Sequence, residues 1–259
     1  MDIREFSMEL FSLKGKTAIV TGGNNGVGMG YVMAFMRAGA NVLVPCLNQN
    51  NWVELEKFAA QSDVGICLME GDLTDEKFRD AVINRCVDEY QAIDILVNNA
   101  GFIIRKPLLE CEDDDFSKVM QINCDALYFL SRKAVRIMLK RGHGKIINIA
   151  SMISFRGGMN NIGYSASKHA VAGITKNFAN ELGQYNIQVN AIAPGYIAAG
   201  NSEEIIHNKE VYEDFLSRIP AGRWGRASDL QGLAVFLASP ASDYINGTII
   251  PVDGGYLNR

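Results

Sequence analysis

The chain has little of what metal centres, disulfide frameworks and nucleic-acid-binding surfaces are built from. Its 259 residues include three histidines and five cysteines, and no two cysteines have Cys-x-x-Cys spacing. This composition favours neither a disulfide framework nor a metal site, so we expect no metal. Lys and Arg number 25 against 29 Asp and Glu, the net charge is −4, and no basic tract is present. Nucleic-acid binding is therefore not expected.

Long apolar runs are absent as well. No run approaches the length of roughly 18 apolar residues that a membrane span needs, and the first five residues contain no apolar signal region. We therefore expect a cytoplasmic protein without a membrane partner. Apolar residues make up 48% of the chain and charged residues 21%. This length and composition suit one domain covering residues 1–259.

Apolar runs of strand length alternate with segments of helical periodicity along the whole chain. The expected strands cover residues 16–21, 41–45, 64–70, 93–97, 145–149, 188–193 and 248–252. The expected helices begin near Val27, and then cover residues 48–60, 75–90, 113–140, 164–181 and 227–238. The alternation predicts an α/β fold with a doubly wound, parallel, seven-stranded sheet and helices on both faces. Residues 197–218 are polar and poorly periodic, and we expect them to form a lid near the site.

A glycine-rich turn follows the first expected strand directly. Its sequence, Gly22-Gly23-Asn24-Asn25-Gly26-Val27-Gly28, has the spacing Gly-x-x-x-Gly-x-Gly and leads into an apolar helical pattern. Glycine permits a tight turn and close backbone approach, and a helix N-terminus offers free N–H groups to an anion. Strand, glycine turn and helix together predict a loop that binds the phosphates of a nucleotide.

A tyrosine and a lysine lie four residues apart at Tyr164 and Lys168. In a helix this spacing places both side chains on one face. The pKa of an unperturbed tyrosine is about 10, and a neighbouring cation is expected to lower it toward the range useful for acid–base catalysis. Ser151, thirteen residues before Tyr164, can hydrogen-bond the same substrate oxygen. Without further support the pair is an ordinary feature of a helix surface.

Together these motifs resemble the short-chain dehydrogenase/reductase family over essentially the whole chain. They are the glycine turn with Thr21, then Asn98-Asn99-Ala100-Gly101, then Ser151, then Tyr164-x-x-x-Lys168, then Pro194-Gly195. The finer resemblance is to the sugar-acid branch, the 2-dehydro-3-deoxy-D-gluconate 5-dehydrogenases, with the gluconate 5-dehydrogenases as close relatives. The segments 93–101, 144–152, 219–225 and 241–244 carry it. The resemblance implies a single-domain Rossmann fold that transfers a hydride between NAD(H) and a secondary alcohol or ketone of a sugar acid.

The resemblance also implies a role for each matching residue. Tyr164 is the expected acid/base, and Lys168 is expected to lower its pKa and to bond the nicotinamide ribose. Ser151 is expected to position the substrate oxygen, and Asn123 to shape a local helix distortion and complete a proton relay. Asn98 is expected to be mainly structural. The expected cofactor-binding residues are Gly22, Asn24, Asn25, Gly26, Val27, Gly28, Cys46, Leu47, Asp72, Leu73, Asn99, Ala100, Gly101, Tyr164, Lys168, Pro194, Gly195 and Ile197.

The chain departs from the family pattern at one position near the nicotinamide. The family usually has a threonine that holds the carboxamide, and this chain has Ala199 there. The contact must be lost or come from elsewhere, for example from Asn201 or Ser202.

A sugar-acid substrate carries a carboxylate, which needs a cation. Arg105 and Lys106 follow the fourth expected strand and Arg156 follows the fifth, at the edge where such sheets bind ligands. We expect Arg105, Arg156 and Ser151 to contact the substrate. Arg223 and Trp224 belong to a segment typical of the sugar-acid branch, where they can instead be structural.

The cofactor preference is predicted from two positions at the end of the second strand. NAD-preferring relatives usually place Asp where this chain has Cys46. NADP-preferring relatives usually place a basic residue where this chain has Leu47 or Asn25. Without a cation, the desolvation of a 2′-phosphate is costly. We therefore expect NAD over NADP, with less discrimination than an Asp would give.

Two other functions stay open at this point. An NADPH-dependent 3-oxoacyl reductase has the same catalytic residues but would need a basic surface for an acidic carrier protein. A non-catalytic dinucleotide sensor can share the fold, because fold does not fix function. The family resemblance also implies a homotetramer, and the apolar segment 248–252 is compatible with an interface.

Overall fold

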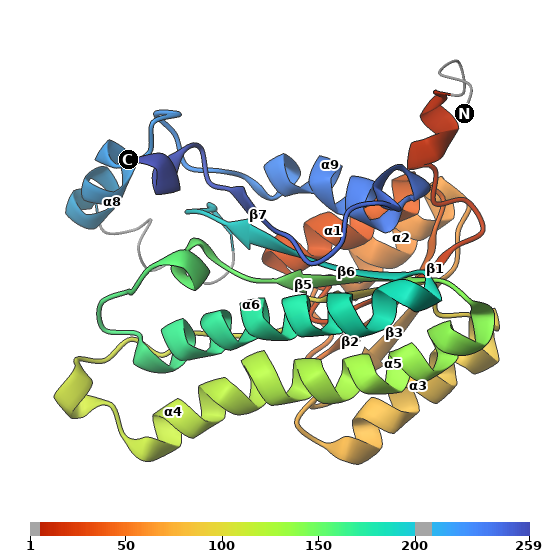
Figure 1. The fold of residues 1–259 in the computed structure, drawn as a ribbon, viewed down its shortest axis with the longest axis horizontal. Helices are drawn as coiled ribbons and strands as arrows, with labels where there is room; N and C mark the ends of the chain where they lie inside the picture. Colours follow the sequence, from red (N-terminus) through yellow and green to blue (C-terminus); the bar gives the residue numbers. More distant parts are fainter. Residues whose placement is uncertain (1–5, 200–208) are drawn as a thin grey trace.

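The computed structural model describes residues 6–199 and 209–259. A parallel seven-stranded sheet with the order β3-β2-β1-β4-β5-β6-β7 forms its centre (Figure 1). The strands are β1 (Thr17–Val20), β2 (Asn41–Cys46), β3 (Ile66–Glu70), β4 (Ile95–Asn98), β5 (Gly144–Ile149), β6 (Ile187–Pro194) and β7 (Ile249–Val252). The predicted doubly wound α/β fold is confirmed.

Helices cover both faces of the sheet (Figure 1). One layer consists of α1 (Gly26–Arg37), α2 (Trp52–Ser62) and α9 (Ala227–Ala238). The other layer contains α3 (Glu76–Tyr90), α4 (Asp113–Met120), α5 (Leu127–Arg141) and α6 (Ile162–Leu182). All four residues of β1 and of β4 are buried, which explains why three of the four residues in each strand are apolar.

The two layers enclose separate apolar cores. The core under α1, α2 and α9 includes Tyr31, Phe35 and Leu230, and the core under α3 and α5 includes Val82, Leu130 and Met138. Helix α1 approaches α9 closely at Gly30, where an added Cβ would lie 3.1 Å from the Ala227 Cβ. The tight packing of α1 fixes the start of that helix relative to the carboxyl ends of the strands.

The predicted helix over residues 113–140 is present but is not one regular α-helix. A π-helix over Gln121–Ala126 separates α4 from α5. A π-turn adds a residue to the repeat, and such turns are frequent at functional sites. The residues after the insertion therefore face directions that a period of 3.6 residues does not predict.

The segment predicted as a lid is described only in part. Helix α8 (Lys209–Ser217) lies beyond one end of the sheet, next to the C terminus (Figure 1). Residues 200–208, which include Asn201 and Ser202, lie outside the described residues. In the ranges that the structure describes, no helix is long and apolar enough to cross a membrane.

Candidate active site

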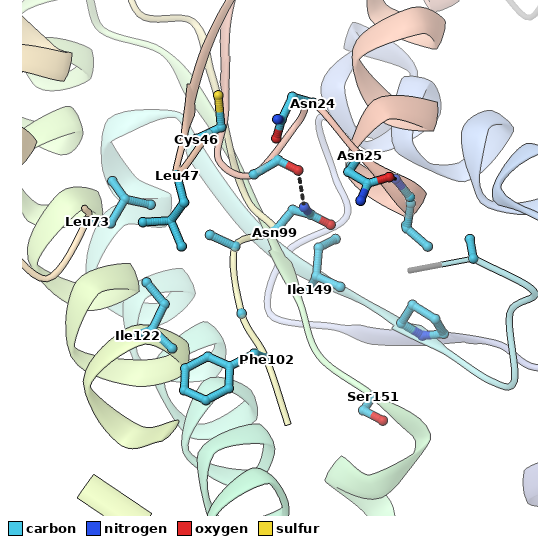
Figure 2. A pocket seen from close by; sticks show the side chains of 18 of the residues that line it. Asn24, Asn25, Cys46, Leu47, Leu73, Asn99, Phe102, Ile122, Ile149 and Ser151 are labelled. Atoms are coloured by element: carbon cyan, nitrogen blue, oxygen red, sulfur yellow. Dashed lines mark hydrogen bonds between the residues drawn. The ribbon is translucent and has the colours of Figure 1, made fainter. Parts of the chain in front are cut away.

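A pocket with a volume of about 480 Å³ opens at the carboxyl ends of the strands, where the order of the sheet changes direction between β1 and β4. This is the position at which doubly wound sheets bind ligands. Figure 2 shows Leu47 and Leu73 at one end and Ser151 at the other. The lining residues that the sequence predicted are Gly22, Asn24, Asn25, Gly26, Val27, Gly28, Cys46, Leu47, Leu73, Asn99, Ala100, Gly101, Ser151, Tyr164, Lys168, Pro194, Gly195 and Ile197.

The glycine turn is fixed to the loop after β4. Thr21 Oγ1 accepts hydrogen bonds from the Asn99 and Ala100 N–H groups, both at 2.9 Å. The Asn99 side chain donates to the carbonyl of Thr21 at 2.9 Å and to that of Gly22 at 3.2 Å, the latter shown as a dashed line in Figure 2. Gly28 must lack a side chain, because an added Cβ would lie 2.4 Å from the Gly22 carbonyl oxygen. The two loops therefore form one rigid wall.

The first turn of α1 provides hydrogen-bond donors for an anion. Asn25 caps the helix by accepting from the Gly26 N–H at 2.7 Å. Among the described residues, the N–H groups of Val27 and Gly28 have no hydrogen-bond partner. Free N–H groups at a helix N-terminus, beside glycines that allow close approach, suit a pyrophosphate. The volume of the pocket also lies within the usual range for cofactor sites, roughly 300–1,000 Å³. These features fit a dinucleotide.

Amide side chains build the corner of the pocket at the end of β2. Asn24 donates to the Asn48 carbonyl at 3.0 Å and to the Asn48 side chain at 2.9 Å, and Asn51 donates to the Asn24 carbonyl at 2.9 Å. Cys46 is only 4% exposed, and its sulfur accepts from the Trp52 indole at 3.3 Å. The residue at the position where relatives use a carboxylate thus packs into the core.

Ser151, Tyr164 and Lys168 converge at the opposite end of the pocket. Ser151 begins a short turn directly after β5, while Tyr164 and Lys168 lie on α6. Ser154 fixes these two elements together, because its hydroxyl donates to the Lys168 carbonyl at 2.7 Å. The Ser151 side chain lies close enough to the Tyr164 hydroxyl to favour a lower pKa for that phenol. The Lys168 ammonium lies 5.5 Å from the centre of the Tyr164 ring.

The predicted lowering of the Tyr164 pKa by Lys168 is wrong for this pocket. Desolvation raises the pKa of Tyr164, and only the Ser151 side chain and the charge of Arg105 act in the opposite direction. Lys168 is 5% exposed, and burial lowers its own pKa to about 8. Its ammonium donates to the Ile149 carbonyl at 2.6 Å. The same exclusion of water thus disfavours the charged form of both groups.

Asn123 lies in the π-helix, where a helix distortion was expected, and its side chain holds the loop after β4. Its amide accepts from the Phe102 N–H and donates to the Phe102 carbonyl, both at 3.0 Å. The amide also donates to the Ser167 hydroxyl at 3.1 Å, and that hydroxyl donates to the Tyr164 carbonyl at 2.8 Å. Asn123 does not line the pocket, so the contacts show a positioning role. Its part in a proton relay stays a prediction.

The nicotinamide side of the pocket is formed by the chain after β6. Gly195 packs closely on the chain after β7, since an added Cβ would lie 2.7 Å from the Asp253 Cα. Ile197 pairs with Gly225 through an isolated parallel bridge. Ala199 lines the pocket, so the position expected to carry the threonine faces the site without a hydroxyl.

Two predicted residues lie beside the lining or have structural partners. Asp72 is exposed between the lining residues Gly71 and Leu73, and its carboxylate accepts from the Thr74 N–H at 2.8 Å. Asn98 donates to Ser131 at 2.9 Å and to Asn148 at 2.8 Å in the buried core, which agrees with the predicted structural role.

The predicted substrate cations have different surroundings. Arg105 acts electrostatically on Tyr164. Lys106 instead forms an ion pair with Asp115 at 2.6 Å. Arg156 lies over the Tyr256 ring at 5.2 Å. Arg223 pairs with Asp229 at 2.7 Å at the start of α9, which is a structural contact.

Sequence reasoning did not predict every residue that lines the pocket. The residues without a predicted role are Pro45, Gly71, Phe102, Ile122, Ile149 and Ala150, while Ala199, expected beside the nicotinamide, and Asn48 line the pocket as well. Most of them lie at or just after strand ends, so their position relative to the predicted strands could have identified them. Ile122 has no such signal, because the π-helix alone turns it toward the pocket. Among residues 6–199 and 209–259, no cluster of three or more His, Cys, Asp or Glu could hold a metal ion.

The Lys168→Met variant tests the cost of burying the ammonium. The folded pKa is about 8, and the unfolded pKa is about 10.4. Below about pH 8 Lys168 is charged in both states, so the wild type carries the full destabilisation from burying the ammonium. Between pH 8 and about 10.4 the unfolded chain binds more protons than the folded one, so the stability of the wild type rises with pH. We expect the stability of Lys168→Met relative to wild type to fall by about 1–3 kcal/mol from pH 7 to pH 10. Urea unfolding at several pH values measures this difference.

The exposed Lys176 on the same helix supplies the control. Lys176→Met should show a difference from wild type that does not change over this pH range. A pH-independent difference for Lys168→Met as well would contradict the lowered pKa.

Comparisons with known proteins agree with this geometry. The family model "Enoyl-(Acyl carrier protein) reductase" matches residues 22–257. The 2-dehydro-3-deoxy-D-gluconate 5-dehydrogenases of Bacillus subtilis and Dickeya dadantii are 48% and 44% identical over 97% of this chain, and over 98% and 99% of their own lengths. A solved gluconate 5-dehydrogenase from Burkholderia cenocepacia, in complex with NADP and tartrate, is 34% identical with a TM-score of 0.92, covering 97% of this chain and 98% of that one. This chain therefore belongs to the short-chain dehydrogenase/reductase family, and it is an oxidoreductase that acts on CH–OH groups with a nicotinamide dinucleotide.

Proposed function

We propose that the protein is an NAD-dependent sugar-acid dehydrogenase that oxidises 2-dehydro-3-deoxy-D-gluconate at C5. The observation that carries the proposal is that Ser151, Tyr164 and Lys168 line one end of a dinucleotide-sized pocket, with Arg105 in electrostatic reach of Tyr164. Ser151 and Tyr164 supply acid–base chemistry on a hydroxyl, and Arg105 suits a substrate carboxylate. The relatives from Bacillus subtilis and Dickeya dadantii carry this activity in their names.

The chain's own residues supply binding and proton transfer. A nicotinamide dinucleotide bound along the glycine turn and the loop after β4 would supply the hydride acceptor or donor. Ser151 and Tyr164 hold the substrate oxygen between their hydroxyl groups, and Tyr164 takes its proton during oxidation and returns one during reduction. Lys168 sits behind Tyr164 with its ammonium fixed on the Ile149 carbonyl. Lys168 lines the pocket, and we expect its ammonium to bond the nicotinamide ribose, as the family resemblance implies.

The raised pKa of Tyr164 has a consequence for the direction of the reaction. A protonated tyrosine is the form that donates a proton to a ketone, whereas alcohol oxidation requires the proton to leave. Arg105 and the Ser151 hydroxyl both favour the tyrosinate. These two contacts therefore assist oxidation, and desolvation assists reduction.

Preference for NAD over NADP is supported by the charge of the pocket. Among the described residues that line it, Lys168 is the one charged side chain, and it lies at the end with Ser151. The corner at Cys46, Leu47 and Asn48 offers backbone groups and amides, which can bind a ribose hydroxyl. A 2′-phosphate there would have no cation in the lining, and desolvating it is costly.

The alternative functions have less support. A reductase for acyl chains on a carrier protein would gain from a basic surface, but the net charge of this chain is −4. A non-catalytic sensor would have no need for Ser151, Tyr164 and Lys168 to line one pocket, as they do here. We also propose a cytoplasmic location on the basis of the family resemblance and the composition.

We propose a homotetramer, in keeping with the family resemblance. Large apolar side chains are exposed on the outer helices and adjoining loops, including Leu109 (97%), Met159 (87%) and Tyr244 (103%). We expect side chains of this kind to be covered at the subunit contacts. Light scattering should give four times the 28.4 kDa chain mass, and a species of one chain mass would contradict the proposal.

The function is tested with an NADH absorbance assay and a panel of sugar acids. The C6 keto sugar acid should turn over, and its uncharged amide should have a kcat/KM lower by about tenfold to a hundredfold, because a charged hydrogen bond contributes roughly 1.5–3 kcal/mol. Arg105→Met should lower kcat/KM for the acid by a similar factor and leave the amide nearly unchanged. Lys106→Met is the matched control, since it removes the neighbouring cation, which does not act on the Tyr164 pKa. Equal activity on acid and amide would overturn the carboxylate proposal.

Tyr164→Phe tests the acid/base assignment. The substitution removes the hydroxyl that exchanges the proton and keeps the ring that lines the pocket. We expect turnover to fall well beyond tenfold while the Kd for the dinucleotide stays close to that of wild type. Single-turnover kinetics and calorimetry measure the two quantities. A residual rate above about a tenth of wild type, a loss of under 1.4 kcal/mol in barrier, would show that another group exchanges the proton.

A further inference from the structure

Glu70 is an acidic residue beside the nucleotide pocket, and it has no part in the catalytic or cofactor-binding roles described above. It ends β3 and pairs with Cys46 at the end of β2 in the register of the sheet. Neighbouring strands lie about 4.8 Å apart, and paired residues project to the same face. Burial is the main cause of the raised pKa of the Cys46 thiol, and the negative charge of Glu70 raises it further. The carboxylate therefore acts directly on the position where relatives carry an Asp.

The Glu70 carboxylate is held over the loop that forms this corner. Gln49 donates its side-chain amide to Glu70 at 2.8 Å. Gln49 follows Cys46, Leu47 and Asn48, all of which line the pocket. In the part of the chain that the structure describes, no Lys or Arg forms an ion pair with Glu70. The Glu70 carboxylate thus keeps its negative charge without a cationic partner among these residues, and the hydrogen bond from Gln49 holds it near the corner.

The cation on the neighbouring element does not balance this charge. Arg79 on α3 is 6% exposed, donates to the Leu73 carbonyl at 2.6 Å, and lies over the Phe129 ring. Helix α3 packs on the opposite face of the sheet from α2. Arg79 therefore does not offset the charge of Glu70 on the side of the corner that faces Cys46 and Gln49.

We propose that Glu70 sets the cofactor preference by repelling a 2′-phosphate from the corner formed by Cys46, Leu47 and Asn48. The proposal rests on the proposed function for the placement of the adenosine ribose at this corner. A ribose hydroxyl is neutral, whereas a phosphate monoester carries about −1.5 to −2 charges at pH 7. Glu70 thus discriminates between the two cofactors through space, while Cys46 packs against Trp52. The chain places its discriminating charge on β3 instead of β2.

The test measures equilibrium binding of NADP⁺ and NAD⁺ by calorimetry, so it does not depend on turnover. Glu70→Gln removes the charge and retains an oxygen that can accept from Gln49. It should tighten the binding of NADP⁺ by about threefold to tenfold and leave that of NAD⁺ within about twofold. Glu70→Lys should produce a larger change in the same direction. The effect should shrink in 0.5 M salt, where the Debye length is only about 4 Å.

Glu181→Gln is the matched control, because it removes the same charge from an exposed position at the end of α6. It should leave both Kd values unchanged. An unchanged Kd for NADP⁺ in Glu70→Gln and Glu70→Lys, or an equal change in Glu181→Gln, would overturn the proposal. The Kd values of the wild type test the NAD preference separately. Tighter binding of NADP⁺ than of NAD⁺ by the wild type would overturn that preference, whereas the effect of Glu70 is decided by the variants.

Discussion

The structure depends on the point where the winding of the sheet reverses between β1 and β4. The connections that follow these adjacent strands leave in opposite directions, so the loops at their carboxyl ends separate and a pocket forms between them. Separation alone would leave two mobile loops. Thr21 and Asn99 prevent this, because their side chains hydrogen-bond the backbone of the opposite loop. The glycine turn and the start of α1 are therefore positioned by contacts to β4 as well as by their own sequence.

A second buried polar network supports the other end of the pocket. Asn98 links β4 to β5 through Asn148 and to α5 through Ser131, and Asn148 donates to Thr175 on α6 at 2.9 Å. Buried polar groups are costly unless they are paired, so such a network specifies one packing of helices on strands. It lies under the helix that carries Tyr164 and Lys168. Burial shifts the pKa values of Tyr164 and Lys168 away from their charged forms. The hydrogen-bonded network below α6 keeps these two side chains in place despite this unfavourable burial.

Most of the fold and much of the pocket could be predicted from the sequence, because short sequence patterns indicate them. Strand ends, the glycine turn and the Tyr164-x-x-x-Lys168 spacing are all read within a few residues, and the structure brings them to one edge of the sheet. Three features are not visible in these local signals, although the family resemblance led us to expect a helix distortion at Asn123. The π-helix turns Ile122 into the pocket, desolvation raises the pKa of Tyr164, and Asp115 removes Lys106 from the available cations.

The two ends of the pocket use electrostatics in different ways. At the reacting end, Lys168 is buried and donates to the Ile149 carbonyl, so its charge is little screened by water. Interactions between charges are strong where water is excluded. At the adenosine end, Asn24 and Asn48 satisfy one another and Glu70 remains exposed to solvent, so charges there interact only weakly and are screened by salt. The first arrangement suits catalysis, which needs strong electrostatic interactions close to the reacting atoms. The second arrangement suits discrimination between cofactors, for which a tenfold difference in affinity is sufficient. Because the carboxylate stays exposed, the fold is not destabilised by a buried charge.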